Sequence, residues 1–248
     1  MIANFYDELA PSYHLIFADW QASMDRQGAW LDAFIRAEWP ATERVLDAAC
    51  GIGTQALPLA ARGYRVTASD LSSGAVARAE QEAKQRGLEL STAVADLRTL
   101  SQRHGQFDLV LACDNALPHL LSDAELLQAV RECYACVRPG GGCLFSMRDY
   151  AEPGSGSEVH GYCVRPIADG RVIVFQVWDW AGRHYDLSIF TVIDRSGAPP
   201  ETQVFRARYY AVPAARILEL MTLVGFEKVR RVEGFVQPVL VGTRPAVQ

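Results

Sequence analysis

Residues 44–56, RVLDAACGIGTQA, join an apolar run to a helical pattern through two glycines. The run RVLDAA predicts a strand, and TQALPLAAR (54–62) predicts a helix that ends before Gly63. Gly51 and Gly53 therefore lie where a strand turns into a helix. Glycine at such a turn permits unusual backbone angles and lets a ligand approach the main chain at the amino end of the helix. The stretch predicts a strand-turn-helix unit with a ligand site at its turn.

The alternation of strands and helices continues beyond this unit. Four more runs predict strands in the segments YRVTASD (64–70), LELSTAVAD (88–96), FDLVLACD (107–114) and GGGCLFSMRDY (140–150). Helices are predicted over 73–86 and after Ser122, whose spacing to Glu125 is that of a capping box. Strands that alternate with helices indicate a parallel, doubly wound sheet, whose ligands bind at the carboxyl ends of the strands.

Residues 151–212 differ from this pattern, because they form β-rich runs separated by turns. Asp169-Gly170 between two alternating runs is a strong hairpin signal, so we expect an antiparallel insert after the fifth strand. A helix over 214–224 and two more strands then return to the core. We therefore predict an α/β fold with a seven-stranded, doubly wound sheet and an antiparallel β insert after strand five. Residues 1–40 form a helical amino-terminal segment, residues 41–150 and 213–248 the core, and the whole is one structural domain.

Composition narrows the class of partner. The chain has 248 residues, of which 50% are hydrophobic, and a formal net charge of -5. The acidic balance argues against nucleic acid, which needs a dense positive face. No run reaches the length of a membrane span, and the amino terminus does not read as a signal peptide. We expect a cytoplasmic protein with a small-molecule partner, no membrane or nucleic-acid partner, and a monomeric or homodimeric state.

Carboxylates near the glycine turn follow the pattern of a nucleotide site. Asp47 precedes the glycines, and Asp70 ends the second strand about 20 residues later. A carboxylate there accepts hydrogen bonds from both ribose hydroxyls, in nicotinamide and adenosyl binders alike. The three-glycine nicotinamide pattern is incomplete because position 56 is Ala, although Ala sometimes replaces the third glycine. Asp96 follows the third strand, in position to receive an adenine amino group.

Together with FDLVLACDNALPHL (107–120) and VRPGGGCLFSMRDY (137–150), these residues resemble a class I S-adenosylmethionine-dependent methyltransferase over Arg44–Tyr150. The resemblance implies a Rossmann-like fold and S-adenosylmethionine as cofactor, with S-adenosylhomocysteine as product. It implies that the glycine loop faces the methionine part, the acid after strand two binds ribose, and the residues after strand three surround adenine. The implied cofactor-binding residues are Tyr13, Asp47, Ala49, Gly51, Gly53, Asp70, Leu71, Asp96, Leu97, Cys113 and His119.

A narrower resemblance is to the glycine N-methyltransferase-like branch. Its strand four ends in an Asn-containing loop with a His four residues on, and its strand five ends in an Arg followed closely by a Tyr; this chain has Asn115, His119, Arg148 and Tyr150 there. The branch also carries an antiparallel insert after strand five. The resemblance implies that Asn and Arg hold an amino-acid substrate, the Arg through its carboxylate, and that His lies by the cofactor.

Three aromatic residues complete the predicted site. Many methyltransferases fold an amphipathic amino-terminal segment over the cofactor, so residues 1–40 are interpreted as a lid, with Tyr13 against the cofactor and Tyr6 against the substrate. Trp178 of the insert, which is placed on the substrate side, is the third. Each also has a purely structural interpretation, as core aromatics of an amphipathic segment or as packing on the sheet.

The sequence leaves the chemistry of the acceptor open. An amine needs only to arrive deprotonated, whereas a hydroxyl usually needs a base, and His119 is the candidate. His119 and Asn115 are therefore the predicted catalytic residues. A cyclase or lyase reaction of the same cofactor, a nicotinamide oxidoreductase and a non-catalytic nucleotide-binding module remain alternatives. No histidine has a partner at metal-ligand spacing, so we expect no metal.

Overall fold

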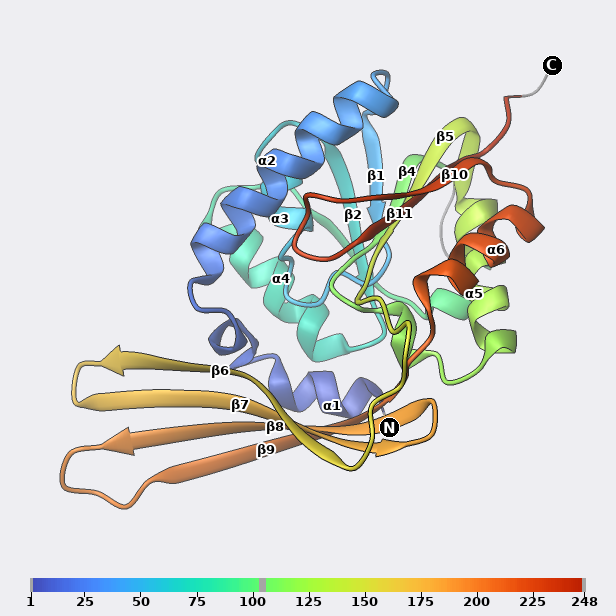
Figure 1. The fold of residues 1–248 in the computed structure, drawn as a ribbon. Helices are drawn as coiled ribbons and strands as arrows, with labels where there is room; N and C mark the ends of the chain where they lie inside the picture. The colour runs from blue at the N-terminus through green and yellow to red at the C-terminus, as the bar shows by residue number, and fades with distance from the viewer. Residues whose placement is uncertain (1, 103–105, 247–248) are drawn as a thin grey trace.

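The computed structural model describes residues 2–102 and 106–246. Its main sheet has seven strands in the order β10-β11-β5-β4-β1-β2-β3 (Figure 1). The strands are β1 (Arg44–Asp47), β2 (Arg65–Asp70), β3 (Ser91–Val94), β4 (Phe107–Ala112), β5 (Val137–Ser146), β10 (Glu227–Val232) and β11 (Val239–Thr243). The first five in chain order are parallel, and β11 is antiparallel to both β5 and β10. The predicted doubly wound sheet is confirmed.

Helices cover both faces of this sheet (Figure 1). One face carries α2 (Trp20–Glu38), α3 (Ala56–Ala60) and α4 (Ser73–Gln85), and the other carries α5 (Asp123–Cys136) and α6 (Ala214–Val224). Burial on both faces explains why β4 is apolar almost throughout, with all six of its residues buried. Ser122 caps α5 as predicted, but Glu125 accepts from the backbone N–H of Leu121 rather than from that of the cap residue.

A second, four-stranded sheet is antiparallel throughout, in the order β6-β7-β8-β9. Its strands are β6 (Ser157–Ile167), β7 (Gly170–Ala181), β8 (His184–Arg195) and β9 (Glu201–Tyr210). The predicted Asp169-Gly170 hairpin joins β6 to β7. Helix α1 (Ile2–Leu9) lies between this sheet and the core (Figure 1), so the insert and the amino terminus meet near the carboxyl ends of the parallel strands.

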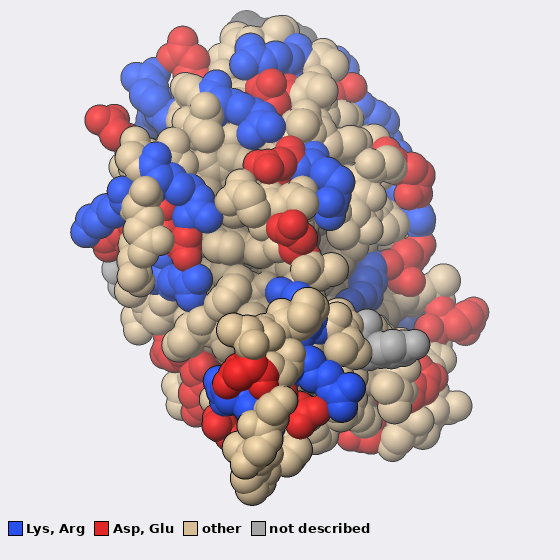
Figure 2. All heavy atoms as spheres, turned by 90° about the vertical axis from the view of Figure 1, so that its left-hand side faces the viewer, with Lys and Arg blue, Asp and Glu red and all other residues tan. Residues whose placement is uncertain are grey.

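Short segments complete the chain. They are the 3-10 helices η1 (Tyr13–Ile16), η2 (Leu97–Gln102) and η3 (Leu117–His119). None of the described helices has the length and apolar composition needed to span a membrane. On the face that lies at the left of Figure 1, acidic and basic side chains are interspersed (Figure 2).

Candidate active site

A cavity opens at the carboxyl ends of β1, β2, β3 and β4, beneath the amino-terminal segment. Its empty volume is about 890 Å³, which includes the open solvent at its mouth, and both apolar and charged side chains form its wall. Ten of the predicted residues line it, namely Tyr6, Tyr13, Ala49, Gly51, Asp70, Leu71, Asp96, Leu97, Cys113 and His119. Six others, Asp47, Gly53, Asn115, Arg148, Tyr150 and Trp178, lie outside its wall.

The two glycines of the turn have different structural roles. Gly51 has φ +51°, and a Cβ there would find its nearest neighbour at 3.9 Å, in the cavity-lining Tyr13. Gly53 has φ +95°, and a Cβ there would lie 2.9 Å from the Leu57 side chain. Gly51 therefore faces the cavity, as predicted. Gly53, which was expected to face the cofactor, instead allows helix α3 to pack closely against the turn.

Asp70 ties the second strand to the glycine turn. Its carboxylate accepts from the backbone N–H of Gly51 and of Ser72, each at 2.9 Å. Burial raises the pKa of Asp70, against the effect of these hydrogen bonds. Asp47 lies fully buried beneath the turn, where burial and the neighbouring Asp70 raise its pKa well above the usual range. Asp47 thus lies buried outside the cavity wall, whereas Asp70 lines the cavity.

Asp96 lines the cavity but already has a strong partner. The Arg98 guanidinium donates to both of its carboxylate oxygens, Nη2 at 2.6 Å and Nε at 3.0 Å, and also bonds Glu125. Burial alone would raise the pKa of Asp96, but the hydrogen bonds from Arg98 lower it. The predicted free acceptor for an adenine amino group is therefore an ion-paired carboxylate.

His119 contacts the amino-terminal helix. Its Nε2 lies 2.6 Å from the hydroxyl of Tyr6, and its ring packs on Tyr209 with centroids 4.1 Å apart. Burial lowers the pKa of His119 to about 3, despite an opposing backbone interaction with Arg208. The imidazole is therefore neutral and weakly basic, which argues against the predicted role as a general base.

Asn115 joins the ends of β4 and β5. Its side chain is buried, donates to the Tyr150 hydroxyl at 2.8 Å and accepts from the backbone N–H of Arg148 at 3.0 Å. The Tyr150 hydroxyl is in turn 2.8 Å from that of Tyr185. Both ends of the amide are thus occupied within the protein. Asn115, predicted to hold the substrate, acts in this structure by fixing Arg148 and Tyr150.

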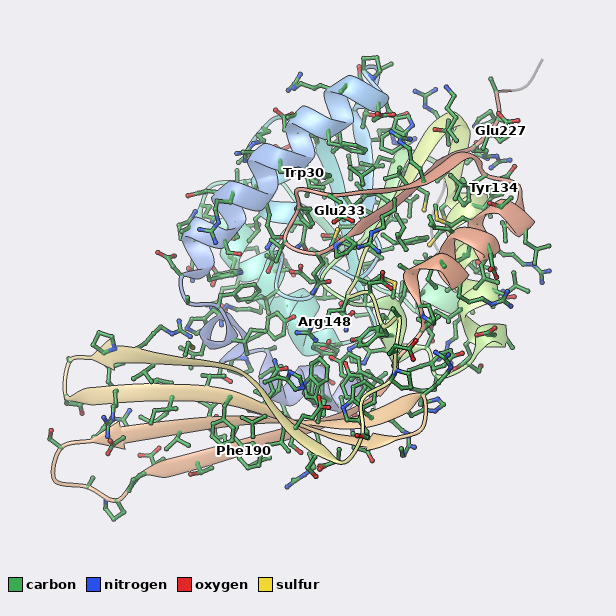
Figure 3. All side chains as sticks on the ribbon, viewed as in Figure 1. Trp30, Tyr134, Arg148, Phe190, Glu227 and Glu233 are labelled. Carbon is green, nitrogen blue, oxygen red and sulfur yellow. The ribbon has the colours of Figure 1, made fainter. Side chains whose placement is uncertain are left out.

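Arg148 lies between the core and the second sheet (Figure 3). Its guanidinium is 4.8 Å from the ring centroid of Trp178, a cation–π contact, and Trp178 stacks in turn on Tyr185. Within residues 2–102 and 106–246, no carboxylate forms an ion pair with Arg148. Trp178 therefore forms the wall on which Arg148 rests, and the guanidinium keeps its capacity to bind an anion.

Asp114 is a cavity-lining residue that sequence reasoning missed. Asp114 and Asn115 have φ of 54° and 69°, in the left-handed region, shortly after the end of β4. Its carboxylate accepts from Gln55 Nε2 at 2.8 Å, and Gln55 also bonds Gln27 of α2 at 2.7 Å. The signal was present as an abrupt change from apolar to polar residues after β4, but the expected strand extended to position 114 and hid the turn.

Helix α1 is attached to the amino end of α4. Asp7 Oδ1 accepts from the Ser72 hydroxyl at 2.6 Å and from the backbone N–H of Gly74 at 2.7 Å. Ser72 is the cap residue of α4 and follows closely on Asp70. The helix that carries Tyr6 is therefore tied to the same turn that positions Asp70.

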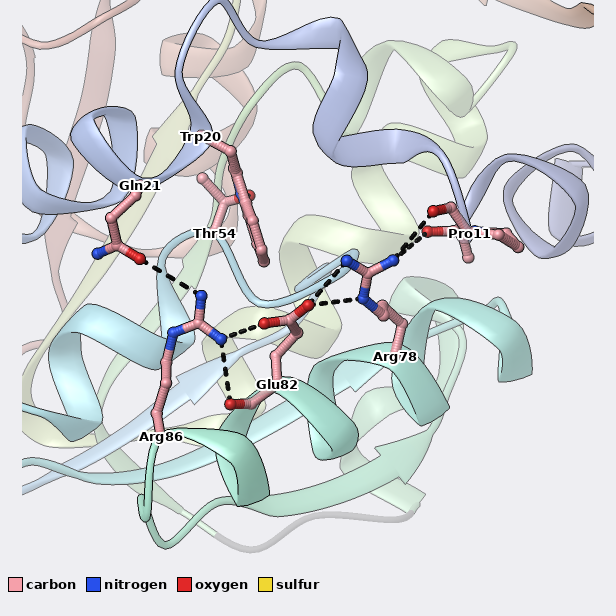
Figure 4. A network of polar contacts seen from close by, with 8 residues as sticks. Pro11, Trp20, Gln21, Thr54, Arg78, Glu82 and Arg86 are labelled. Atoms are coloured by element: carbon pink, nitrogen blue, oxygen red, sulfur yellow. Dashed lines mark hydrogen bonds and ion pairs between the residues drawn. The ribbon is translucent and has the colours of Figure 1, made fainter. Parts of the chain in front are cut away.

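A second set of contacts holds the chain between α1 and α2 (Figure 4). Arg78 donates to the carbonyl of Pro11 at 3.0 Å, and Arg86 donates to Gln21 at 3.4 Å. Glu82 lies between the two arginines and pairs with both. Burial alone would raise the pKa of Glu82, but hydrogen bonds from Arg86 and Arg78 bring it below its usual value. Helix α4 thus anchors both ends of this connection.

The family model and two relatives that match this chain are named as methyltransferases. Residues 45–141 match a family model described as a methyltransferase domain. A glycine/sarcosine N-methyltransferase of Parasynechococcus marenigrum is 30% identical over 85% of this chain and 72% of its own length. A second protein of that name, from Halorhodospira halochloris, is also 30% identical. That match covers 58% of this chain and 52% of the length of the relative.

Solved structures share the fold. DesVI of Streptomyces venezuelae has a TM-score of 0.79 at 18% identity, with 90% of this chain and 92% of that chain covered. CalS10, an amino pentose methyltransferase from Micromonospora echinaspora solved with its cofactor bound, has a TM-score of 0.78 at 22% identity and the same coverage. At these identities the likeness concerns the fold.

Proposed function

Because the chain belongs to the class I S-adenosylmethionine-dependent methyltransferases, we propose that it methylates an amine of a small molecule that carries a carboxylate, such as an amino acid. The observation that carries the proposal is Arg148. Asn115 accepts from the backbone N–H of Arg148, and the half-buried guanidinium rests on Trp178. This guanidinium has no ion pair in the described protein and suits a carboxylate of the acceptor.

The cavity fits the cofactor of this family. The carboxylate of Asp70 lies in its wall, where it suits a ribose, and the apolar Leu71, Ala95 and Leu97 beside it suit a flat base. Gly51 leaves the main chain of the turn open to the methionine part. When bound, S-adenosylmethionine supplies a methyl group on a positively charged sulfur.

The contribution of the protein is placement and the exclusion of water. Tyr6 and Tyr13 cover the cavity from the amino-terminal segment, and their rings lie 5.9 Å apart in an edge-to-face contact. Arg148 would orient the acceptor by its carboxylate, so that the amine reaches the cavity with its lone pair directed inward.

An amine is favoured over a hydroxyl for two reasons. The pKa of His119, lowered to about 3 by burial, leaves it a poor base for activating a hydroxyl. The relatives are also named as N-methyltransferases of glycine and sarcosine, and one structural neighbour as an amino pentose methyltransferase. An oxygen acceptor with His119 as base is the less supported alternative.

Mass spectrometry tests the proposal directly. The chain and S-adenosylmethionine are incubated with glycine, sarcosine and the other common amino acids, with their decarboxylated amines and with the matching hydroxy acids. We expect the mass gain of one methyl group on amino acids, less on amines without a carboxylate, and none on hydroxy acids. Transfer to hydroxy acids alone would contradict it. A reaction without any acceptor would indicate a cyclase or lyase.

Melting temperatures separate the remaining alternatives. A ligand that binds only the folded state raises the melting temperature. We expect S-adenosylhomocysteine to raise it and NADH to leave it unchanged, whereas a nicotinamide enzyme would show the reverse. Stabilisation without any turnover would support a non-catalytic binding module.

A further inference from the structure

Three carboxylates line the cavity, and one of them is much less engaged than the others. Asp70 accepts from two backbone N–H groups, and Asp96 is paired with the Arg98 guanidinium. Asp114 has a single hydrogen-bond donor, the neutral amide of Gln55. Among the described residues of the wall, Asp114 is therefore the acid with capacity left for a cationic ligand.

Its place in the fold is tightly specified. The backbone N–H of Asp114 donates to the Ser146 hydroxyl at 2.9 Å, and that of Asn115 donates to the Ser146 carbonyl at 3.0 Å. These bonds hold the chain in the left-handed conformation in which Asp114 has φ 54°. Such a conformation is unfavourable for a residue with a side chain, and it is retained where the surroundings impose it, often at functional sites.

The carboxylate of Asp114 is held by the amide of Gln55, which is held in turn by Gln27. Gln55 is 2% exposed and Gln27 is 1% exposed, so each needs its partner inside the protein. Gln27 Oε1 and Asp114 Oδ2 share the amide group of Gln55, at 2.7 Å and 2.8 Å. Helix α2 therefore helps to set the orientation of a carboxylate that lies in the cavity wall.

Asp114 and Arg148 follow neighbouring strands. The parallel strands β4 and β5 pair through Ala112 and Phe145, and the two charged residues come shortly after their ends. Burial raises the pKa of Asp114, while the hydrogen bond from Gln55 and the positive charge of Arg148 oppose this rise. The two form no ion pair with each other in the described chain, so both side chains can contact a third group.

We propose that Asp114 binds the amino group of the acceptor while Arg148 binds its carboxylate, so that the site recognises an amino acid by both of its charges. This inference rests on the proposed function and adds the residue that selects the amine. An ammonium seated on Asp114 gives one proton to the carboxylate, which becomes the neutral acid. The nitrogen lone pair that this frees is what methyl transfer requires.

Asp114→Asn tests the proposal, because it keeps the shape and an oxygen for Gln55 while removing the charge. With glycine and sarcosine as probes, we expect kcat/KM to fall roughly tenfold or more, as for a lost hydrogen bond to a charged group. The Kd for S-adenosylhomocysteine, measured by calorimetry, should stay unchanged. Glycine should raise the melting temperature of the parent protein loaded with S-adenosylhomocysteine, but not that of Asp114→Asn.

Two further variants make the result specific. Arg148→Gln should raise KM for the amino acid more than for methylamine, which lacks the carboxylate, whereas Asp114→Asn should affect both amines. Asp186→Asn removes the same charge from an exposed position of β8 and should match the parent in every assay.

The outcomes separate this inference from the proposed function. A parent protein that methylates no amine contradicts both. A parent that methylates amines, with an Asp114→Asn variant that does so equally well, contradicts the role of Asp114 alone. A variant that loses affinity for S-adenosylhomocysteine but keeps its acceptor KM would assign Asp114 to the amino group of the cofactor instead, and would also overturn the inference.

Discussion

The hydroxyl of Tyr6 lies 2.6 Å from Nε2 of His119 and joins helix α1 to the loop after β4. Both side chains line the cavity, and their rings pack edge to face with centroids 5.3 Å apart. The contact connects the segment that covers the cavity to η3, the short helix in the loop after β4. Loss of either side chain should therefore change the cavity wall and also weaken the attachment of helix α1.

Tyr6→Phe keeps the ring and removes this hydrogen bond. We expect the free energy of unfolding to fall by about 1 kcal/mol, because His119 loses a buried partner. The Kd for S-adenosylhomocysteine should rise roughly threefold to tenfold as α1 detaches more often. Tyr210→Phe is the matched control, since it also removes a hydroxyl bonded at 2.9 Å, to Asp123, away from the cavity wall. Equal Kd values in the two variants would disprove the role of Tyr6.

The pKa of His119 predicts how stability depends on pH. Its folded value of about 3 lies below the value of about 6.5 in an unfolded chain, so between these limits the unfolded state binds one more proton. Stability should therefore fall as the pH drops from about 6.5 towards 3. Urea unfolding of the parent and of His119→Gln at a series of pH values tests this. Between about pH 3 and 6.5 the variant should take up one proton fewer on unfolding, so its free energy of unfolding should change less steeply with pH. Parallel curves would show that His119 is protonated in the folded state.

Gly51→Ala should mainly weaken cofactor binding, whereas Gly53→Ala should mainly reduce stability. At Gly53 the added methyl group meets Leu57 at 2.9 Å with φ +95°, so we expect a stability loss of about 2 kcal/mol or more. At Gly51 the methyl group meets only Tyr13, at 3.9 Å, so stability should fall less while the affinity for S-adenosylhomocysteine falls more. Urea unfolding and calorimetry on both variants give the comparison. A Gly51→Ala variant with normal affinity would remove this turn from the binding site.

The positions that local patterns predicted well are those at the ends of strands. Gly51, Asp70 and Cys113 reach the cavity because each terminates or follows an apolar run whose length can be read from the sequence. Parallel strands bring such ends to one edge, so predicting the sheet also predicts their proximity. The same reasoning predicted that Arg148 and Asn115 lie near the site; both come after strand ends, but outside the cavity wall.

The direction of a side chain could not be predicted in the same way. Asn115 turns inward because Tyr150, 35 positions away, offers its hydroxyl. Tyr6 meets His119 across 113 positions. Asp114 reaches the cavity through a left-handed turn. Asp and Asn tolerate this conformation, but their presence alone does not predict it. Each depends on tertiary contacts that leave no periodic signal.

Asp7 should control how firmly the amino-terminal helix closes the site. Asp7→Ala removes two hydrogen bonds, from the Ser72 hydroxyl and the backbone N–H of Gly74, that lower the pKa of this carboxyl. Because the folded pKa is lowered, the stabilisation is complete above the ordinary Asp pKa and is lost as the pH falls through the folded value. At neutral pH the variant should therefore lose all of the stabilisation that these two hydrogen bonds provide.

Hydrogen exchange of residues 2–9 measures this effect directly. We expect exchange in α1 of Asp7→Ala to be roughly tenfold faster than in the parent, with the central strands unchanged, because only a local contact is lost. The Kd for S-adenosylhomocysteine should rise in parallel, since Tyr6 is carried on the same helix. Glu8→Ala removes an exposed acid from the next position and should alter neither quantity. Faster exchange without a change in Kd would mean that α1 folds over the cavity but does not help to retain the cofactor, which would assign that function to the anchored chain around Pro11 and Tyr13.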